Sequence, residues 1–211
     1  MYHFTHVDNL PKIIASGAMS CDRILKNSDV TCHEIAYSYL KERRMRTRVE
    51  VAPGGTLGDY VPFYFAPCSP MLLTYIDGNV TGQQEYQDEI IYLVSNAEYI
   101  SERGLRFVFT DGHPITEPKA FYNDLADIGE VDFSIMSGRL WYNTNDDPDR
   151  KRRRQAEFLV HESFPWDCIR GIGVLTNATQ ELVEHAMDQG SHKPPCVIRP
   201  GWYYPNKGKR R

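Results

Sequence analysis

Apolar and polar residues alternate in short stretches along this chain, and their spacing changes several times. Residues 1–6, MYHFTH, alternate with a period of two, which is typical of a β-strand. From Asp8 the spacing becomes helical, with Pro11 in the first turn and Gly17 as the stop. The pattern therefore predicts a first strand followed directly by a short helix that Asp8 caps.

The rest of the chain is a mixture of equally short elements. Further strands are predicted at 60–67, 88–94, 105–110, 157–161, 169–176 and 196–204. Further helices are predicted at 33–44, 69–76, 95–104, 117–127 and 177–190. The glycine-rich 52–59 and the polar, turn-rich 137–156 are predicted loops, and Pro62 predicts an edge strand or an irregular start. Without regular βαβ alternation, this order indicates one α+β domain with a mixed central sheet and short flanking helices.

Composition agrees with one globular domain and argues against several classes of protein. The chain has 211 residues, of which 41% are hydrophobic, and no apolar run reaches the roughly 18–20 residues of a membrane span. The N-terminus lacks the basic and apolar regions of a signal peptide. The five cysteines form no CxxC pair, which argues against a zinc ribbon or a thioredoxin-type site. We therefore expect a cytoplasmic protein with reduced thiols, no membrane contact and no bound metal.

The net charge of −4 conceals two dense basic runs. Residues 41–48 carry five cations and one glutamate, and residues 150–154 carry five cations and no acid. A mildly acidic protein with local arginine-rich patches is typical of one that binds an anionic ligand at a defined place. The alternative is that both runs are solvated faces, but two such runs in one chain favour phosphate binding.

One acidic residue follows the second basic run, at the start of a predicted strand. Glu157 would share a strand face with Leu159 and His161, and Gln155 would lie on the same side two residues earlier. A Gln-x-Glu pair at the point where a polar loop enters a strand suggests a catalytic carboxylate. The alternative is an edge-strand glutamate that pairs with a neighbouring arginine.

The N-terminal strand carries a second group of candidates. His3 and Thr5 share one strand face, His6 lies on the other, and Asn9 follows near the helix start. A helix start offers free N–H groups to an anion, and histidine and threonine offer donors and acceptors to a carboxamide or a ribose. The alternative is that these residues are structural. The glycine-rich PGGTLG has the spacing of neither a Walker loop nor a GxGxxG motif and is a weak nucleotide signal.

Four stretches of the chain together resemble the DarT family of DNA ADP-ribosyltransferase toxins. They are HFTHVDNLPKIIASG, VAPGGTLGDYVPFYFAPCSPML, FYND and DRKRRRQAEFLVHESFPW, and they fall within residues 2–166. The resemblance implies a single ADP-ribosyltransferase-like α+β domain over residues 1–211, with NAD+ as the substrate. It also implies a nucleobase of single-stranded DNA, most often thymidine, as the acceptor, and a DarG-type macrodomain antitoxin that reverses the modification.

Carried over residue by residue, the resemblance implies roles for the groups described above. Glu157 matches the catalytic glutamate of the family's Q-x-E motif. His3 and Thr5 match the NAD-binding H-x-T of the first strand, and His6 and Asn9 complete that block.

The resemblance also implies a catalytic arginine after the second helix and an acceptor-presenting loop at about 137–156. Our choice for the arginine is Arg44, from a set that comprises Arg43, Arg44, Arg46 and Arg48. The expected DNA contacts are Arg48, Trp141, Tyr142, Arg152, Arg153, Arg154 and Gln155. Within the arginine triplet, one or two side chains should hold phosphates, and another should pair with Asp146, Asp147 or Asp149 to brace the loop.

Two alternatives stay open at this level. A transferase of the same fold could modify guanosine, RNA or a protein. A non-catalytic single-strand-binding module could use the same basic and aromatic residues, but it would need neither Glu157 with Gln155 nor the His3 and Thr5 pair. Release of nicotinamide from NAD+ separates an enzyme from such a module.

Overall fold

The computed structural model describes residues 1–83, 85–138, 141–188, 190–205 and 207. The strands are β1 Tyr2–His6, β2 Ala18–Ser20, β3 Tyr60–Tyr64, β4 Ile90–Val94, β5 Phe107–Thr110, β6 Phe121–Tyr122, β7 Glu157–His161, β8 Ser163–Pro165, β9 Gly171–Val174 and β10 Cys196–Ile198. The α-helices are α1 Leu10–Ser16, α2 Asp22–Lys26, α3 Ser38–Arg44, α4 Pro70–Ile76, α5 Ala97–Glu102, α6 Phe133–Met136, α7 Arg150–Arg153 and α8 Asn177–Met187. Short 3-10 segments are Val7–Asn9, Leu57–Asp59, Gln87–Glu89, Leu125–Glu130, Trp166–Cys168 and Pro200–Trp202.

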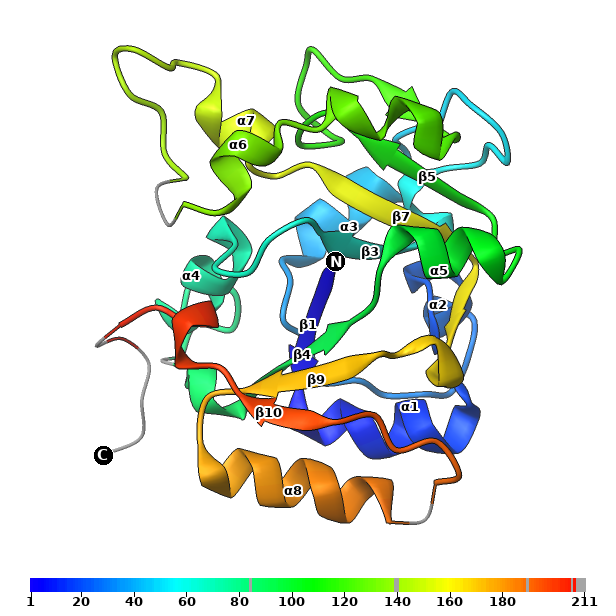
Figure 1. Ribbon diagram of the computed structural model, residues 1–211, viewed down its shortest axis with the longest axis vertical. Helices are drawn as coiled ribbons and strands as arrows, with labels where there is room; N and C mark the ends of the chain where they lie inside the picture. Colours follow the sequence, from blue (N-terminus) through cyan, green and yellow to red (C-terminus); the bar gives the residue numbers. More distant parts are fainter. Residues whose placement is uncertain (84, 139–140, 189, 206, 208–211) are drawn as a thin grey trace.

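Most of the strands form one sheet with the order β10-β9-β4-β1-β3-β7-β5-β6. β9 and β10 are parallel, and the other neighbouring pairs are antiparallel. β2 and β8, which the sequence pattern did not predict, form a small separate sheet. Short helices surround the main sheet, with α1 below β9 and α8 below β10 in Figure 1, and α4 and α5 on opposite sides. No helix in the described ranges combines the length and the apolar character that a membrane crossing needs.

The main sheet separates into two halves between β1 and β3. β1 pairs with β4, and β3 with β7, along their full lengths, but among the described residues β1 and β3 pair only through Tyr2 and Tyr64. The halves therefore diverge beyond that pair. β3 lies between β1 and β7 in the sheet, so the prediction that Pro62 marks an edge strand is wrong. Because β1 has already left β3 at this point, the missing N–H of Pro62 leaves no ladder position unfilled.

The strand that follows the second basic run alternates as predicted. Phe158 and Val160 are fully buried in the main core, whereas Leu159 packs in a separate cluster on the other face. Burial of each such side chain stabilises the fold by about 1.5–3 kcal/mol. Glu157 shares the face of Leu159, so the packing of this strand fixes the side on which its carboxylate lies.

The predicted first strand and helix are confirmed, but the predicted cap is wrong. Gly17 ends α1 in the left-handed region at φ 74°, and its N–H donates to the carbonyl of Ile14. The cap at the other end is His6, which precedes a 3-10 turn. Its Nδ1 accepts a hydrogen bond from the backbone N–H of Asp8 at 3.2 Å.

Two predicted helices differ from the structure. In the segment 33–44, which was predicted to be one helix, only Ser38–Arg44 is helical. The side chain of Asn9 hydrogen-bonds the backbone N–H and C=O of His33, so these groups are not available for helical hydrogen bonds. The predicted helix at 117–127 is instead β6 and a 3-10 segment. The Asp124 side chain caps that segment by accepting from the N–H of Ala126.

The region 137–156, predicted to be a loop, contains α7. The backbone N–H of Arg154 donates to the carbonyl of Arg150, which closes this single turn. Residues 139 and 140 of the predicted loop lie outside the described residues. The last predicted strand is shorter than expected, since β10 ends at Ile198 and a 3-10 turn follows.

Candidate active site

A cavity of about 970 Å³ lies where the two halves of the sheet diverge. Its walls come from β1, β3, α1, α2, α3 and the segment 28–36. Most of the wall is apolar, and polar side chains from distant parts of the sequence converge on it, an arrangement typical of a small-molecule site. Among these side chains are His3, Thr5, Arg44 and Glu157.

Arg44 and Glu157 form a buried ion pair in this cavity. Arg44 Nη1 donates to both carboxylate oxygens of Glu157, at 2.9 Å and 3.2 Å. The two side chains are 12% and 4% exposed, so the pair is shielded from bulk water. Burial acts to lower the pKa of Arg44, but the charge and hydrogen bonds of Glu157 outweigh it and raise that pKa. The arginine chosen from four candidates is therefore the one that contacts the predicted catalytic glutamate.

The backbone around Glu157 is fixed by two neighbours. Glu157 pairs with Tyr64 across the β3–β7 ladder. Its N–H donates to Thr110 Oγ1 at 3.0 Å, and that hydroxyl donates in turn to the carbonyl of Gly112 at 2.6 Å. Burial, reinforced by the charge of Glu157, raises the pKa of Tyr64, so this phenol stays neutral. The carboxylate is thus held in place before any ligand binds.

One nitrogen of Arg44, Nη2, is buried and makes no hydrogen bond within the described residues. A buried donor without a partner costs roughly 1–3 kcal/mol, which a ligand oxygen can recover when it binds there. This unpaired donor therefore indicates that the cavity binds a ligand with acceptor oxygens near Arg44 Nη2.

The predicted N-terminal block lies partly in the same cavity. His3 lines it and donates from Nδ1 to the carbonyl of Pro62 at 2.8 Å, while burial lowers the pKa of His3. The neutral ring then offers Nε2 as an acceptor. Thr5 is buried and accepts from Asn9 Nδ2 at 3.0 Å, which leaves its own O–H to donate. Asn9 also lines the cavity and bonds both backbone groups of His33.

His6 is not among the described residues that line the cavity. Its ring stacks on that of His33, with centroids 3.7 Å apart and planes within 2°. His6, Asp8 and His33 have ligand atoms close enough to one another for a metal ion. The nitrogen lone pairs of stacked rings lie in parallel planes, so the two histidines are poorly placed to share an ion. This stack instead supports His33, which does line the cavity.

His113 is a cavity residue that the sequence pattern did not identify. It lies in the loop after β5, and its Nδ1 accepts from the N–H of Ile115 at 3.2 Å. Burial lowers the pKa of His113, against the raising effect of the Glu157 charge. The neutral ring with Nδ1 as acceptor carries its proton on Nε2. A histidine in a polar loop directly after a predicted strand was the only signal in the sequence.

The second basic run is largely engaged by acidic side chains. Arg152 pairs with Asp149 at 2.8 Å and with Asp111 at 2.7 Å. Its carbonyl accepts from the N–H of His113. A Cβ on Gly112 would lie 2.3 Å from Arg152 Nη1, so this guanidinium packs closely on the loop at Gly112. Arg152 therefore braces the loop that carries His113.

The other two arginines of the triplet also have protein partners. Arg153 pairs with Asp132 and, at 2.5 Å, with Asp147. Arg154 is buried and donates to the carbonyl of Pro67 at 2.9 Å. Pairing of the triplet with nearby aspartates is confirmed by Arg152 with Asp149 and by Arg153 with Asp147. Phosphate contacts of the triplet stay a prediction.

The remaining predicted DNA contacts lie outside the lining of the cavity. Trp141 and the exposed Tyr142 make an edge-to-face pair, with Lys151 Nζ 5.8 Å from the Trp141 ring centroid. Gln155 folds back to donate to the carbonyl of Lys151 at 2.9 Å. Arg48 is exposed. Their contacts with DNA stay predictions.

Known proteins are similar to this chain in sequence and in fold. The family model described as "ssDNA thymidine ADP-ribosyltransferase, DarT" matches residues 2–204. A DNA ADP-ribosyl transferase of Thermus sp. (strain 2.9) is 38% identical over 206 residues, 97% of this chain and 95% of the relative. The structure of Thermus sp. 2.9 DarT with ADP-ribosylated ssDNA matches with a TM-score of 0.89 at 37% identity. That match covers 96% of this chain and 95% of the other.

Two further matches extend the comparison. Thermus sp. 2.9 DarT in complex with NAD+ has a TM-score of 0.83 at 34% identity and covers 96% of both chains. A DNA ADP-ribosyl transferase-DNA ADP-ribosyl glycohydrolase fusion protein of Thermosipho africanus is 22% identical over 210 residues, 98% of this chain and half of that protein. The predicted α+β ADP-ribosyltransferase-like domain is confirmed. The chain belongs to the DarT family of single-stranded DNA thymidine ADP-ribosyltransferases.

Proposed function

We propose that this protein transfers ADP-ribose from NAD+ to a thymidine base of single-stranded DNA and releases nicotinamide. The observation that carries the proposal is the buried pair of Arg44 and Glu157 in a large, mostly apolar cavity. Family membership supplies the reaction class, and the ion pair supplies groups able to perform it.

The cavity fits NAD+ by the chemistry of its donors and acceptors. His3 Nε2 is free to accept from a carboxamide or a hydroxyl, and the O–H of Thr5 is free to donate. The unpartnered Nη2 of Arg44 suits an anionic or carbonyl oxygen. These residues would hold the dinucleotide with its nicotinamide ribose toward Glu157.

Glu157 is suited to stabilise the transition state of nicotinamide release. NAD+ supplies the ribosyl carbon, which becomes oxocarbenium-like as nicotinamide departs. A carboxylate that accepts a hydrogen bond from the ribose 2′-hydroxyl gains strength as this positive charge develops, so it favours the transition state over the ground state. Arg44 uses only part of the acceptor capacity of Glu157, which leaves lone pairs for the hydroxyl.

Arg44 and His113 are suited to the acceptor base. As the thymine ring nitrogen attacks the ribosyl carbon, the bond from that carbon to nicotinamide breaks and the proton of the nitrogen passes to the Glu157 carboxylate; negative charge builds on the thymine carbonyl oxygens while this proton leaves. Arg44 Nη2 and the Nε2–H of His113 can donate to the thymine carbonyl oxygens and stabilise that charge. A duplex would keep this nitrogen paired, so a single strand is the suitable acceptor.

Incubation with NAD+ and short oligonucleotides tests the proposal. We expect release of nicotinamide with thymidine-containing single-stranded DNA and much slower release with the same sequence as a duplex or as RNA. A non-catalytic binding module would release none. Faster release with uridine-containing RNA than with DNA would replace DNA by RNA as the acceptor, and equal rates would show that the enzyme does not distinguish them.

Thr5→Val and His3→Ala are expected to lower NAD+ affinity at least fivefold each, since each removes about one hydrogen bond to the nucleotide. The preferred DNA sequence should not change. Calorimetric titration with NAD+ measures the first effect, and an oligonucleotide panel measures the second. Thr81→Val, which changes an exposed threonine outside the cavity lining, is the matched control. Unchanged affinity in both cavity variants would place the nucleotide elsewhere.

The cellular setting follows from the substrate. An enzyme that modifies DNA acts in the compartment that holds DNA, so we place this protein in the cytoplasm of a bacterial-type cell. The Thermosipho africanus relative joins a transferase to a glycohydrolase in one chain. We propose that a separate DarG-type antitoxin with such an activity is the partner of this chain.

A further inference from the structure

The two basic runs of this protein differ in whether their charges are available. Arg152 and Arg153 already pair with carboxylates and Arg154 is buried, which leaves Lys151 as the exposed cation of the second run. Arg46 and Arg48 are exposed, and within the described part of the chain their side chains make no hydrogen bond or ion pair. Phosphate binding needs donors that are not already engaged. The availability of the charges therefore favours the first run over the second.

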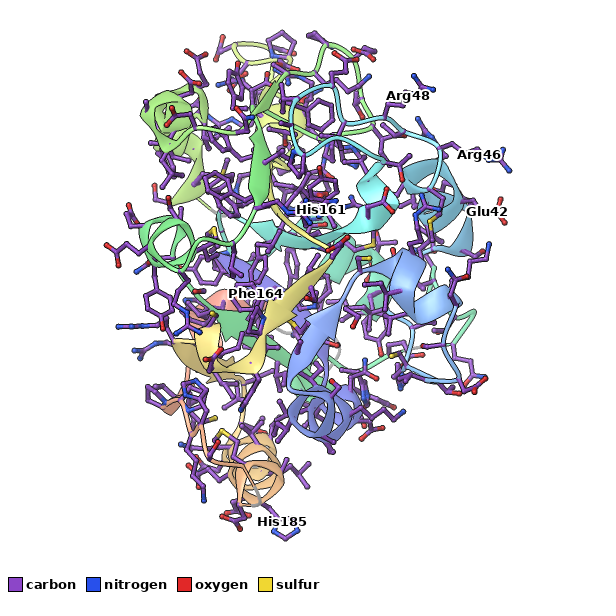
Figure 2. The ribbon with its side chains drawn as sticks, turned by 90° about the vertical axis from the view of Figure 1, so that its right-hand side faces the viewer. Glu42, Arg46, Arg48, His161, Phe164 and His185 are labelled. Carbon is purple, nitrogen blue, oxygen red and sulfur yellow. The ribbon has the colours of Figure 1, made fainter. Side chains whose placement is uncertain are left out.

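The first run begins at the rim of the cavity. Arg44 reaches Glu157 from α3. Its neighbour Arg43 is exposed and makes one long contact, 3.4 Å from Nη2 to the carbonyl of Ile115, which lines the cavity. Figure 2 shows Arg46 and Arg48 pointing outward along one side of the molecule. We call Arg43, Arg46 and Arg48 the α3 basic face.

The backbone that presents these arginines is held firmly. Thr47 accepts at its carbonyl from the N–H of Leu57 at 2.9 Å, and Val49 donates to the carbonyl of Gly55 at 3.0 Å. Met45 packs so closely on Gly58 that a Cβ there would lie 2.4 Å from the sulfur. The α3 basic face is therefore preorganised, which reduces the entropy lost when a strand binds.

Two aromatic rings lie at the start of the same helix. Tyr39 is 53% exposed, and its ring lies against that of Tyr37 with centroids 5.0 Å apart. Tyr39 precedes Arg43 by four residues, so both lie on one side of α3. An exposed ring beside unpaired cations is the combination that single-stranded nucleic acids use, with bases stacked and phosphates contacted.

We propose that the acceptor DNA strand runs along the α3 basic face, with phosphates on Arg43, Arg46 and Arg48 and a flanking base stacked on Tyr39. This inference rests on the proposed function, because the same strand must deliver its target base to Glu157. In the second basic run, Arg152 and Arg153 brace the active-site loops through their aspartate partners.

The test measures oligonucleotide affinity across a salt series for Arg46→Gln/Arg48→Gln. We expect the slope of log affinity against log salt to fall by about 1.4, or about 0.7 for each lost phosphate contact. NAD+ affinity should be unchanged, which shows that the variant is folded. Glu42, exposed on the same helix, supplies an opposite test: Glu42→Gln should tighten DNA binding at low salt.

Arg103→Gln/Arg170→Gln is the matched control, since it removes two exposed cations near α5, across the molecule from the α3 basic face. We expect its slope to equal that of the parent. An unchanged slope in Arg46→Gln/Arg48→Gln, while the parent still modifies DNA, would overturn this inference alone. A parent that binds DNA but releases no nicotinamide would instead overturn the proposed function.

Discussion

Replacement of Glu157 by glutamine is expected to slow ADP-ribose transfer by about a thousandfold, or ~4 kcal/mol in the barrier. The neutral amide has the shape of the carboxylate but cannot stabilise the positive charge that develops on the ribose. Affinity for the oligonucleotide should persist, because Glu157 is buried in the cavity, whereas the arginines expected to hold the strand are exposed. Nicotinamide release and oligonucleotide binding, measured on the same preparation, separate the two effects.

Glu162→Gln is the matched control for this experiment. Glu162 lies just beyond the end of β7, is more than half exposed and pairs with Arg106 at 3.2 Å. Removal of its charge should leave the transfer rate within about twofold, as is usual for exposed pairs. Transfer by Glu157→Gln within tenfold of the parent would remove Glu157 from the mechanism.

Replacement of Arg44 by methionine is expected to reduce both transfer and stability. Transfer should fall at least about a hundredfold, because the variant loses both the hold on Glu157 and the free Nη2 donor. The free energy of unfolding should fall by about 3 kcal/mol, since a buried carboxylate is left without its cation. Urea denaturation measures the second effect.

The double variant Arg44→Met/Glu157→Gln distinguishes a broken ion pair from a general packing defect. With neither charge present, we expect it to be at least ~1 kcal/mol more stable than Arg44→Met alone. Arg43→Met changes the exposed neighbour on α3 and should alter stability by less than about 0.5 kcal/mol. A double variant whose loss equals the sum of the single losses would show that the pair is not energetically coupled.

The parts of the site that the sequence predicted follow from strand periodicity and from the resemblance to DarT. Alternation along β1 and β7 decides which side chains face the cavity, and it places His3, Thr5 and Glu157 there. The choice of Arg44 came from the resemblance. Its contact with Glu157 joins residues 113 positions apart, which no local pattern can show.

The parts that the sequence did not predict depend on partners far along the chain. The local sequence of 150–154 predicts a phosphate-binding patch. In the structure, however, Arg152 pairs with Asp111, 41 residues away, and Arg153 pairs with Asp132, 21 residues away. Likewise, 33–37 has a helical pattern, but the side chain of Asn9 takes up the backbone groups of His33. In both places a tertiary contact overrides a local preference.

Mass spectrometry of the modified oligonucleotide tests the central claim most directly. The parent and Glu157→Gln would each be incubated with NAD+ and a panel of single strands in which one thymidine has varied flanking bases. We predict one ADP-ribose on the thymine base, matched by an equal amount of released nicotinamide, and no adduct with the variant. An adduct confined to another base or to the protein itself, or an equal yield from Glu157→Gln, would contradict the account.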